Sequence, residues 1–232
     1  MENVKRQEDI LAYLKENHFA SVAELASVVY TSQATVRREL EKLEAKGAVK
    51  SVYGGAVISE YEKTPVPLYL RDKENSLKKE RIAADSAKLV EDNSTVIFDS
   101  SSTVRRMCKY VKERKGLTVI TNNLRVCEEL KDSDVNVIAT GGTLVKKREC
   151  FVGHFAEEFI RKIKADYLFF SSQGLSENGD ITDSSEEEIS IRRAMLNSAK
   201  KKILLCDSSK VGEEYPFVLC NISEIDKVII DT

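Results

Sequence analysis

Residues 31–47 read TSQATVRRELEKLEAKG, and this stretch decides the fold of the N-terminal part of the chain. Thr31 and Ser32 are good N-caps, and Gly47 stands where glycine commonly follows a helix, so a helix is predicted over residues 33–46. At about 100° per residue, three apolar side chains of this helix form one core-facing stripe: Val36, Leu40 and Leu43. The opposite face carries Ala34, Thr35, Arg38, Glu41 and Lys42, with Arg37 at its flank.

Two further helices are predicted before this one. Ile10, Leu11 and Leu14 recur at helical spacing and predict a helix over residues 3–17. Ser21-Val22-Ala23-Glu24 has the S-x-x-E form of a capping box, which starts a second helix that ends near Val28. Two short helices joined by a tight turn, the second exposing Arg, Lys, Thr and Gln, are typical of a helix-turn-helix that enters the major groove of DNA. A solvated charged face without a partner is the alternative interpretation.

A hairpin is predicted directly after this helix. Residues 48–53 and 56–59 flank Gly54-Gly55, a two-residue turn signal, and would form a wing beside the helix. We therefore expect double-stranded DNA to contact Ser32, Gln33, Thr35, Arg37, Arg38, Lys42 and Tyr53.

The charge of the chain makes any DNA contact local. The 36 Lys and Arg are balanced by 38 Asp and Glu, a formal net charge of -2, so the composition excludes a basic chain that wraps nucleic acid. Residues 31–53, however, hold five bases and three acids. Positive charge is thus concentrated around the predicted recognition helix.

The length and the prolines predict two domains. A chain of 232 residues holds one large domain, or a small and a medium one. Pro65 and Pro67 lie in a polar stretch that marks a linker, and beyond it short β-branched runs alternate with helical stretches, which is the pattern of a parallel α/β sheet. We expect a DNA-binding domain at 1–58, a linker at 59–79 and an α/β domain at 80–232.

Five predicted strands of the second domain end in small, hydroxyl, amide or glycine residues. The strands cover residues 95–98, 117–120, 135–139, 167–170 and 203–206. Ligands of open α/β sheets bind beyond the carboxyl ends of the strands, so these ends predict a pocket. Its expected residues are Asp99, Ser100, Ser101, Ser102, Thr103, Thr121, Asn122, Gly141, Gly142, Gln173, Gly174 and Lys210.

This pocket has the composition of a phosphate site. The loop Asp99–Thr103 precedes a predicted helix over Val104–Val111, where amides, the helix dipole and hydroxyls converge. Lys210 would supply a cation, and Gly141-Gly142 would let backbone amides approach the ligand. The serines and threonine could equally be N-caps alone.

Several motifs resemble one known family. Residues 35–40 (TVRREL), 43–47 (LEAKG) and 53–56 (YGGA) resemble the winged helix-turn-helix of the DeoR family of bacterial sugar-metabolism repressors. The family usually has Gly in the turn where this chain has Tyr30, and His where it has Tyr53. Residues 79–83 (KERIA), the loop Asp99–Thr103 and residues 207–210 (DSSK) resemble the effector domain of that family, whose fold is similar to ribose-5-phosphate isomerase and glucosamine-6-phosphate deaminase.

The resemblance implies a regulator of transcription. It implies a repressor of a sugar-utilisation operon that is released from its operator by a phosphorylated sugar, and a homo-oligomer, at least a dimer. The related enzymes carry a catalytic acid followed by glycine, where this chain has Gln173-Gly174-Leu175; an amide cannot shuttle a proton, so no catalytic residue is expected. A sugar-phosphate isomerase or deaminase that carries a DNA-binding domain is the alternative function, and an activator with the same parts is a third.

Cofactors, metals and membranes are not expected. The five cysteines include no C-x-x-C pair and the two histidines are far apart, so these residues are interpreted as structural. The acidic run 186–188 begins a predicted helix over residues 186–197 and is interpreted as a solvated cluster that favours the helix dipole. The longest apolar run, Ile10–Leu14, is far too short for a membrane span, and no signal peptide is indicated, so the cytoplasm is the expected compartment.

Overall fold

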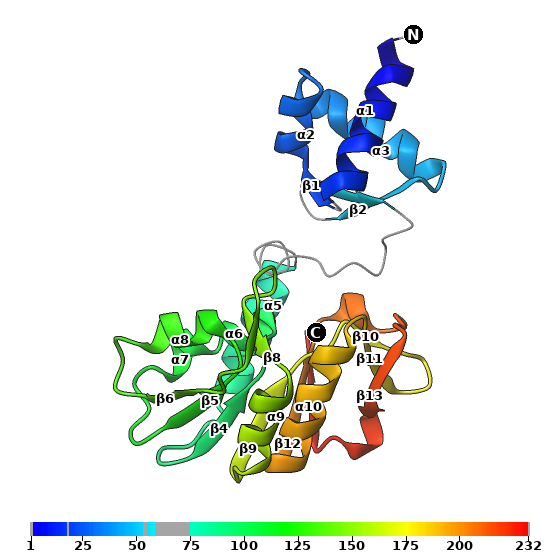
Figure 1. The fold of residues 1–232 in the computed structure, drawn as a ribbon. Helices are drawn as coiled ribbons and strands as arrows, with labels where there is room; N and C mark the ends of the chain where they lie inside the picture. Colours follow the sequence, from blue (N-terminus) through cyan, green and yellow to red (C-terminus); the bar gives the residue numbers. More distant parts are fainter. Residues whose placement is uncertain (1, 18, 53–54, 59–74, 232) are drawn as a thin grey trace. The chain divides into compact units, whose positions relative to one another are not determined.

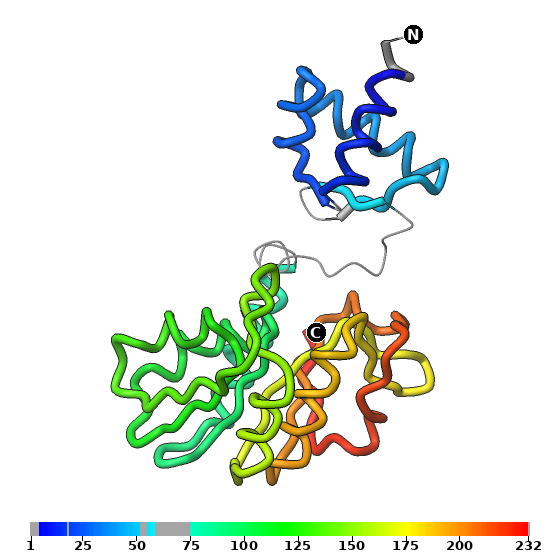
Figure 2. Tube along the Cα trace, viewed as in Figure 1, coloured from blue at the N-terminus to red at the C-terminus, as the bar shows by residue number. Residues whose placement is uncertain are grey.

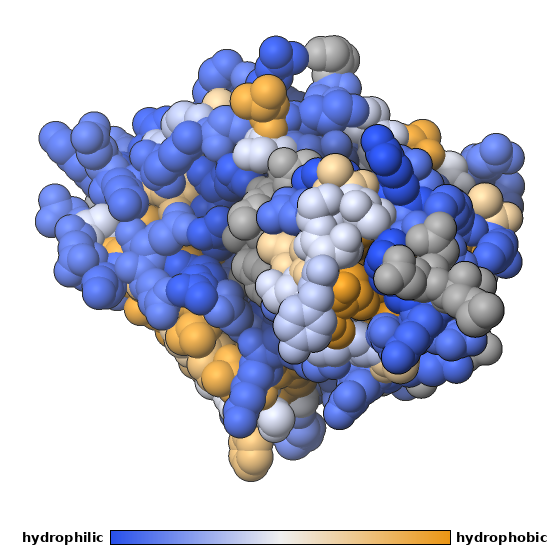
Figure 3. All heavy atoms as spheres, turned by 90° about the horizontal axis from the view of Figure 1, so that it is seen from above, coloured by the Kyte–Doolittle hydropathy of each residue, from blue (hydrophilic) through white to orange (hydrophobic). Residues whose placement is uncertain are grey.

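The computed structural model describes residues 2–17, 19–52, 55–58 and 75–231 (Figures 1 and 2). Its contacts divide the chain into two compact units, Met1–Val66 and Pro67–Thr232. Figure 3 shows a surface that is mostly hydrophilic on the face in view. The exposed large apolar side chains of the described residues come from separate elements, among them Tyr30, Leu77 and Phe155.

The N-terminal unit packs helices on a small antiparallel sheet of order β1-β3-β2. Its elements are α1 (Glu2–Asn17), β1 (Phe19–Ser21), α2 (Val22–Val28), α3 (Gln33–Ala45), β2 (Val49–Val52) and β3 (Gly55–Ile58). The predicted stripe of α3 is buried together with Ile10, Leu14 and Leu25, so it faces the core. Strand β1 was not predicted, because three residues are too few to show a period of two.

The predicted helix caps of this unit are present. Ser21 Oγ accepts a hydrogen bond from the Glu24 amide at 3.1 Å, and the Glu24 carboxylate accepts one from the Ser21 amide at 2.7 Å. Ser32 Oγ accepts from the Thr35 amide at 3.2 Å, and Gly47 follows α3 with φ +68°. These caps fix the two helices on either side of the turn.

The turn of the wing does not lie at Gly54-Gly55 as predicted. Gly55 is the first residue of β3 and pairs with Val52 of β2. A Cβ atom at Gly55 would lie 2.2 Å from the carbonyl oxygen of Ala20, so glycine is needed here for the close approach of β1. Tyr53, an expected DNA contact, lies outside the described residues.

The C-terminal unit is built on a parallel sheet of order β14-β12-β9-β4-β5-β6. Its strands are β4 (Thr95–Phe98), β5 (Thr118–Thr121), β6 (Asn136–Ala139), β9 (Ala165–Phe170), β12 (Ala199–Cys206) and β14 (Lys227–Ile230). The five predicted strands are all present, within a few residues of their expected bounds. Two smaller sheets join them: β7 (Thr143–Val145) with β8 (Cys150–Val152), and β10 (Gly174–Leu175), β11 (Asp180–Asp183) and β13 (Phe217–Asn221).

Helices cover both faces of the six-stranded sheet, as Figure 1 shows. One face packs on α5 (Ser76–Ala87), α6 (Ser102–Arg105), α7 (Cys108–Val111) and α8 (Leu124–Leu130). The other packs on α9 (His154–Arg161) and α10 (Glu186–Ser198). Val96 and Phe98 contribute to the first core and Ile97 to the second. Residues 96–98 are therefore all apolar, since both faces of β4 are buried.

Two predicted boundaries change in this unit. The single helix expected over Val104–Val111 consists of two four-residue helices, α6 and α7, which begin at Ser102 and Cys108. A helix of one turn has only a small dipole, so the predicted help of the dipole to phosphate binding is reduced. Helix α5 begins at Ser76, so residues 76–79, expected in the linker, are helical.

The strand order places a topological switch between β4 and β9. From β4 the chain runs outward through β5 to β6, and it returns through β7, β8 and α9 to β9 on the other side of β4 (Figure 2). The segments that follow β4 and β9 therefore lead to opposite faces of the sheet. The crevice between such segments is where open α/β sheets bind ligands.

Candidate functional site

The exposed side of α3 carries most of the expected DNA contacts. Gln33, Arg37 and Arg38 are exposed, and Thr35 is half-buried. The hydroxyls of Ser32 and Thr35 lie 2.9 Å apart at the start of the helix. Because the apolar stripe is on the other side, these groups are available to DNA without any change in the core.

Glu39 limits the freedom of one expected contact. Its buried carboxylate accepts hydrogen bonds from Gln7 at 2.6 Å and from Lys42 at 3.0 Å. The Gln7 contact chiefly holds the pKa of Glu39 below its ordinary value. Lys42 is thus paired within the unit and stays about half exposed, while Lys46 donates to Gln7 at 3.0 Å. Sequence analysis did not predict this network, although Glu39 is adjacent in sequence to a residue of the charged face.

At the second site, Asp99 is a buried support. We use the name strand-end site for the residues at the carboxyl ends of β4, β5, β6, β9 and β12. Asp99 accepts hydrogen bonds from the amides of Ser101 at 2.9 Å and Ser171 at 3.2 Å, and from Arg192 Nε at 3.0 Å. The carboxylate therefore joins the segments after β4 and β9, and we revise its expected role from ligand contact to support.

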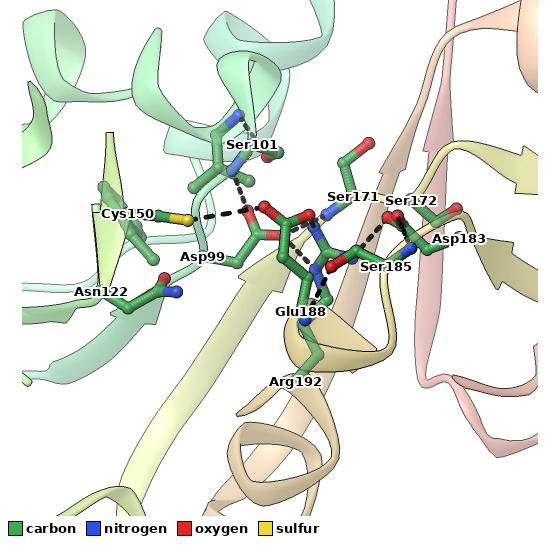
Figure 4. Close-up of polar contacts among 12 residues, drawn as sticks. Asp99, Ser101, Asn122, Cys150, Ser171, Ser172, Asp183, Ser185, Glu188 and Arg192 are labelled. Atoms are coloured by element: carbon green, nitrogen blue, oxygen red, sulfur yellow. Dashed lines mark hydrogen bonds and ion pairs between the residues drawn. The ribbon is translucent and has the colours of Figure 1, made fainter. Parts of the chain in front are cut away.

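Arg192 of α10 is the centre of this network, and sequence analysis did not find it. The guanidinium is buried and pairs with Asp99 at 3.0 Å, Asp183 at 2.7 Å and Glu188 at 3.2 Å. Figure 4 shows these three carboxylates around it. Although burial disfavours the charged form, the three carboxylates together raise the pKa of Arg192 above its ordinary value.

Glu188 corrects the interpretation of the acidic run. Glu186 and Glu187 are exposed as expected, but Glu188 is buried and pairs with both Arg192 and Arg148. Cys150 Sγ lies 3.5 Å from the same carboxylate (Figure 4). The run is therefore partly a buried element of the site, and not a solvated cluster throughout.

Lys210 reaches the strand-end site as expected. It lies in a short 3₁₀ helix, Ser208–Lys210, that follows β12. Its ammonium donates to Ser171 Oγ at 2.9 Å and lies 3.8 Å from Asp207, and its side chain is 19% exposed. Since Ser171 follows β9 and its amide binds Asp99, Lys210 lies next to the switch between β4 and β9.

Several of the remaining expected ligand contacts make hydrogen bonds or close backbone contacts within the protein. Thr121 Oγ1 donates to the Phe98 carbonyl at 2.8 Å and accepts from the Asn123 amide at 3.0 Å, so it supports the β4–β5 junction. Gln173 accepts from the Ser184 amide at 3.2 Å. Gly141 and Gly142 have φ of +66° and +106°, which favour glycine. A Cβ atom at Gly174 would lie 2.4 Å from the Glu213 carbonyl oxygen, so this glycine serves packing.

Unpaired polar atoms gather at the same edge of the sheet. Several buried polar atoms of the described residues have no hydrogen-bond partner. They lie after β4, after β5, between β7 and β8, or after β11, and they include Thr103 Oγ1, Asn122 Oδ1, Asn123 Nδ2, Arg148 Nη2 and Ser184 Oγ. Buried polar groups in proteins are nearly always paired, and a bound molecule is one way to satisfy them. Ser100, Ser101 and Ser102 are buried beside them.

Family models cover both units. Residues 6–62 match the DeoR-like helix-turn-helix domain, and residues 74–232 match the DeoR C terminal sensor domain. The chain belongs to the DeoR family. It is a DNA-binding regulator of transcription, as the motifs of α3 and of the strand ends imply.

Curated relatives of this DeoR-family chain match over almost its whole length. The HTH-type transcriptional regulator GolR of Listeria innocua is 33% identical over 98% of this chain and 90% of that protein. The L-fucose operon activator of Haemophilus influenzae is 31% identical over 97% and 91% of the two chains. The HTH-type transcriptional repressor GlcR of Bacillus subtilis is 30% identical over 96% and 86%. The DeoR family thus includes named activators and named repressors.

Solved structures resemble this DeoR-family chain in fold. The tetrameric eIF2B-beta2-delta2 complex of C. thermophilum matches with a TM-score of 0.50 at 15% identity, over 87% of this chain and 62% of that one. Ribose 5-phosphate isomerase A of Methanocaldococcus jannaschii matches with a TM-score of 0.45 at 13% identity, over 60% and 55%.

In the part of the chain that the structure describes, no group of His, Cys, Asp and Glu side chains has the arrangement of a metal site, and no helix is long and apolar enough to cross a membrane. All five cysteines are free thiols, four of them buried. Burial raises the pKa of Cys206 and Cys220 to about 11 each, which disfavours the reactive thiolate.

Proposed function

We propose that this DeoR-family regulator is a repressor of a sugar-utilisation operon. A homo-oligomer, at least a dimer, would present paired α3 helices to double-stranded operator DNA. A phosphorylated sugar bound at the strand-end site would then release the protein. The observation that carries the proposal is the convergence of Lys210 and unpaired buried polar atoms on the switch between β4 and β9.

The strand-end site offers a phosphate three kinds of donor. Lys210 supplies a cation whose nearest carboxylate, Asp207, is 3.8 Å away. The loop after β4 supplies the hydroxyls of Ser100, Ser102 and Thr103, and Gly141-Gly142 supplies backbone amides that a ligand can approach closely. Charge-assisted hydrogen bonds of this kind are the strong ones in phosphate recognition.

Contacts near the linker support a coupling of the two functions. Asn75, the first described residue after the linker, donates hydrogen bonds to Asp207 at 3.1 Å and to Ser209 at 2.9 Å. The same short segment carries Lys210. A ligand that moves Lys210 therefore also acts on the start of α5. The change that it causes in the free energy of DNA binding is set by the difference between its affinities for the DNA-bound and the released form of the protein.

We further propose that the chain does not catalyse a reaction on the sugar phosphate. Three buried carboxylates, Asp99, Asp183 and Glu188, are each bound to Arg192. A fourth, Asp207, accepts hydrogen bonds from Asn75 and Ser209 and lies 3.8 Å from Lys210, and Gln173 is bound to the Ser184 amide. None of these groups is thus placed to transfer a proton to a ligand.

A binding and turnover experiment tests these proposals. The wild-type protein first selects a duplex from a random-sequence pool, and gel shifts then follow release of that duplex by a panel of sugar phosphates. The panel includes ribose 5-phosphate, glucose 6-phosphate, fructose 6-phosphate and glucosamine 6-phosphate. We expect at least one to release the duplex and none to be converted. Release by none, or conversion that scales with the protein, would contradict the corresponding proposal.

A further inference from the structure

Arg148 is a buried arginine with one unpaired edge. It lies between β7 and β8 and is 3% exposed. Its Nη1 lies 2.9 Å from Glu188 Oε2, whereas Nη2 is buried and has no hydrogen-bond partner among the described residues. Desolvating a charged donor without a partner is unfavourable, so this edge of the guanidinium requires an acceptor that the described residues do not supply.

Contacts place this edge at the strand-end site. Glu188, the carboxylate that pairs with Arg148, also pairs with Arg192, which in turn holds Asp99 directly after β4. Arg148 is therefore connected to the loop Asp99–Thr103 through three successive ion pairs. Lys210 donates to Ser171 Oγ and the Ser171 amide donates to Asp99, so Lys210 and Arg148 are connected to the same central carboxylate through different contacts.

Asn122 adds an unpaired acceptor beside the same hairpin. The side-chain Nδ2 of Asn122 donates to the Phe151 carbonyl at 3.0 Å, and the main-chain carbonyl oxygen of Asn122 accepts from the Phe151 amide at 2.8 Å. Asn122 Oδ1 is left buried and unpaired. Figure 4 shows the Asn122 amide pointing toward the side of the cluster that Glu188 and Asp99 occupy.

A donor without an acceptor and an acceptor without a donor are both satisfied by one hydroxyl group. Such a group accepts a hydrogen bond from Arg148 Nη2 and donates one to Asn122 Oδ1. A phosphate monoester is largely dianionic at neutral pH, so its oxygens act chiefly as acceptors and would satisfy only the arginine. The pair Arg148 and Asn122 is therefore matched to the sugar end of a ligand, and Lys210 to its phosphate end.

We infer that Arg148 and Asn122 recognise a hydroxyl of the effector and so distinguish a phosphorylated sugar from phosphate itself. This inference rests on the proposed effector function of the strand-end site. It assigns the ligand to the class of polyhydroxylated phosphate monoesters.

Two arginine variants of the full-length protein test the inference. Titration calorimetry measures the binding of inorganic phosphate and of the sugar phosphate that the panel selects. Arg148→Met removes the guanidinium at similar length, and we expect it to weaken sugar-phosphate binding by about tenfold or more, as for loss of a hydrogen bond to a charged group. Binding of inorganic phosphate should stay within about twofold of wild type. Arg148→Lys keeps a cation beside Glu188 but lacks the second nitrogen, so it should fold and show the same selective loss.

The possible outcomes separate this inference from the proposed function. Equal weakening of phosphate and sugar phosphate in both variants, or no weakening in the folded Arg148→Lys protein, would overturn the role of Arg148. Failure of wild type to bind any of the probes would overturn the effector function and this inference with it. Lys210→Ala should instead weaken both ligands, which identifies the phosphate end.

Discussion

Helix α3, the proposed recognition helix, and the strand-end site place their expected ligand contacts in different surroundings. On α3 the expected DNA contacts are exposed on one side and the core residues are buried on the other. At the strand ends, most of the expected ligand contacts are buried, and Asp99 ties the loop after β4 to Arg192. A substitution on α3 can therefore change function alone, whereas one at the strand ends changes function and stability together.

The largest effect is expected for Arg192→Ala. It leaves Asp99, Asp183 and Glu188 buried without their common cation, so the free energy of unfolding should fall by about 3–5 kcal/mol. Urea denaturation measures the change. Arg193→Ala is the matched control on the same helix, because that side chain is exposed and donates to a single carbonyl, and it should cost about 1 kcal/mol or less. Equal effects of the two substitutions would remove the difference between the two regions.

A smaller effect, confined to function, is expected for Arg38→Ala. The side chain is exposed on α3, so the selected duplex should bind at least about fivefold more weakly while the stability stays unchanged. Gel shifts measure the affinity, and Lys15→Ala, an exposed base at the end of α1, is the control for general charge loss. An unchanged affinity of folded Arg38→Ala protein would mean that α3 is not the recognition helix.

The smallest effect is expected for Tyr30→Gly in the turn before α3. Tyr30 has φ +48° and is 95% exposed, so its side chain strains the backbone without contributing to the core. Glycine relieves that strain, so the free energy of unfolding should rise by up to about 1 kcal/mol. The greater conformational entropy of glycine in the unfolded chain offsets part of this gain. Thermal unfolding of Tyr30→Gly beside Tyr30→Phe checks this. A lower stability of the glycine variant than of the phenylalanine variant would show that the turn needs a side chain.

How far sequence could predict each region follows from the range of the interactions. The helices, caps and apolar stripe of the N-terminal unit were predictable because they depend on residues at most four apart, as in the Ser21–Glu24 capping box. The turn of the wing was predicted wrongly because the close contact of Gly55 is with Ala20, far away in the sequence. The same limit applies to Arg192, which is separated by 93 residues from Asp99.

One local signal could have revealed Arg192. It lies three residues after Ile189 and four before Leu196, so it stands on the apolar stripe of α10, with Glu188 one turn before it. A charged residue on such a stripe is buried only if it is paired. The breaks between α6 and α7 had no comparable signal, since residues 102–111 contain no proline or glycine.

Operator release by Lys210→Ala tests most directly whether the strand-end site controls the recognition helix. The variant loses the cation that we propose binds the phosphate, and it leaves α3 unchanged. Lys201→Ala, which replaces an exposed lysine earlier on β12, is its control. We predict that both variants bind the selected duplex as wild type does, and that only Lys210→Ala needs at least about tenfold more sugar phosphate for half-release. A release curve of Lys210→Ala that coincides with those of wild type and Lys201→Ala would contradict the account.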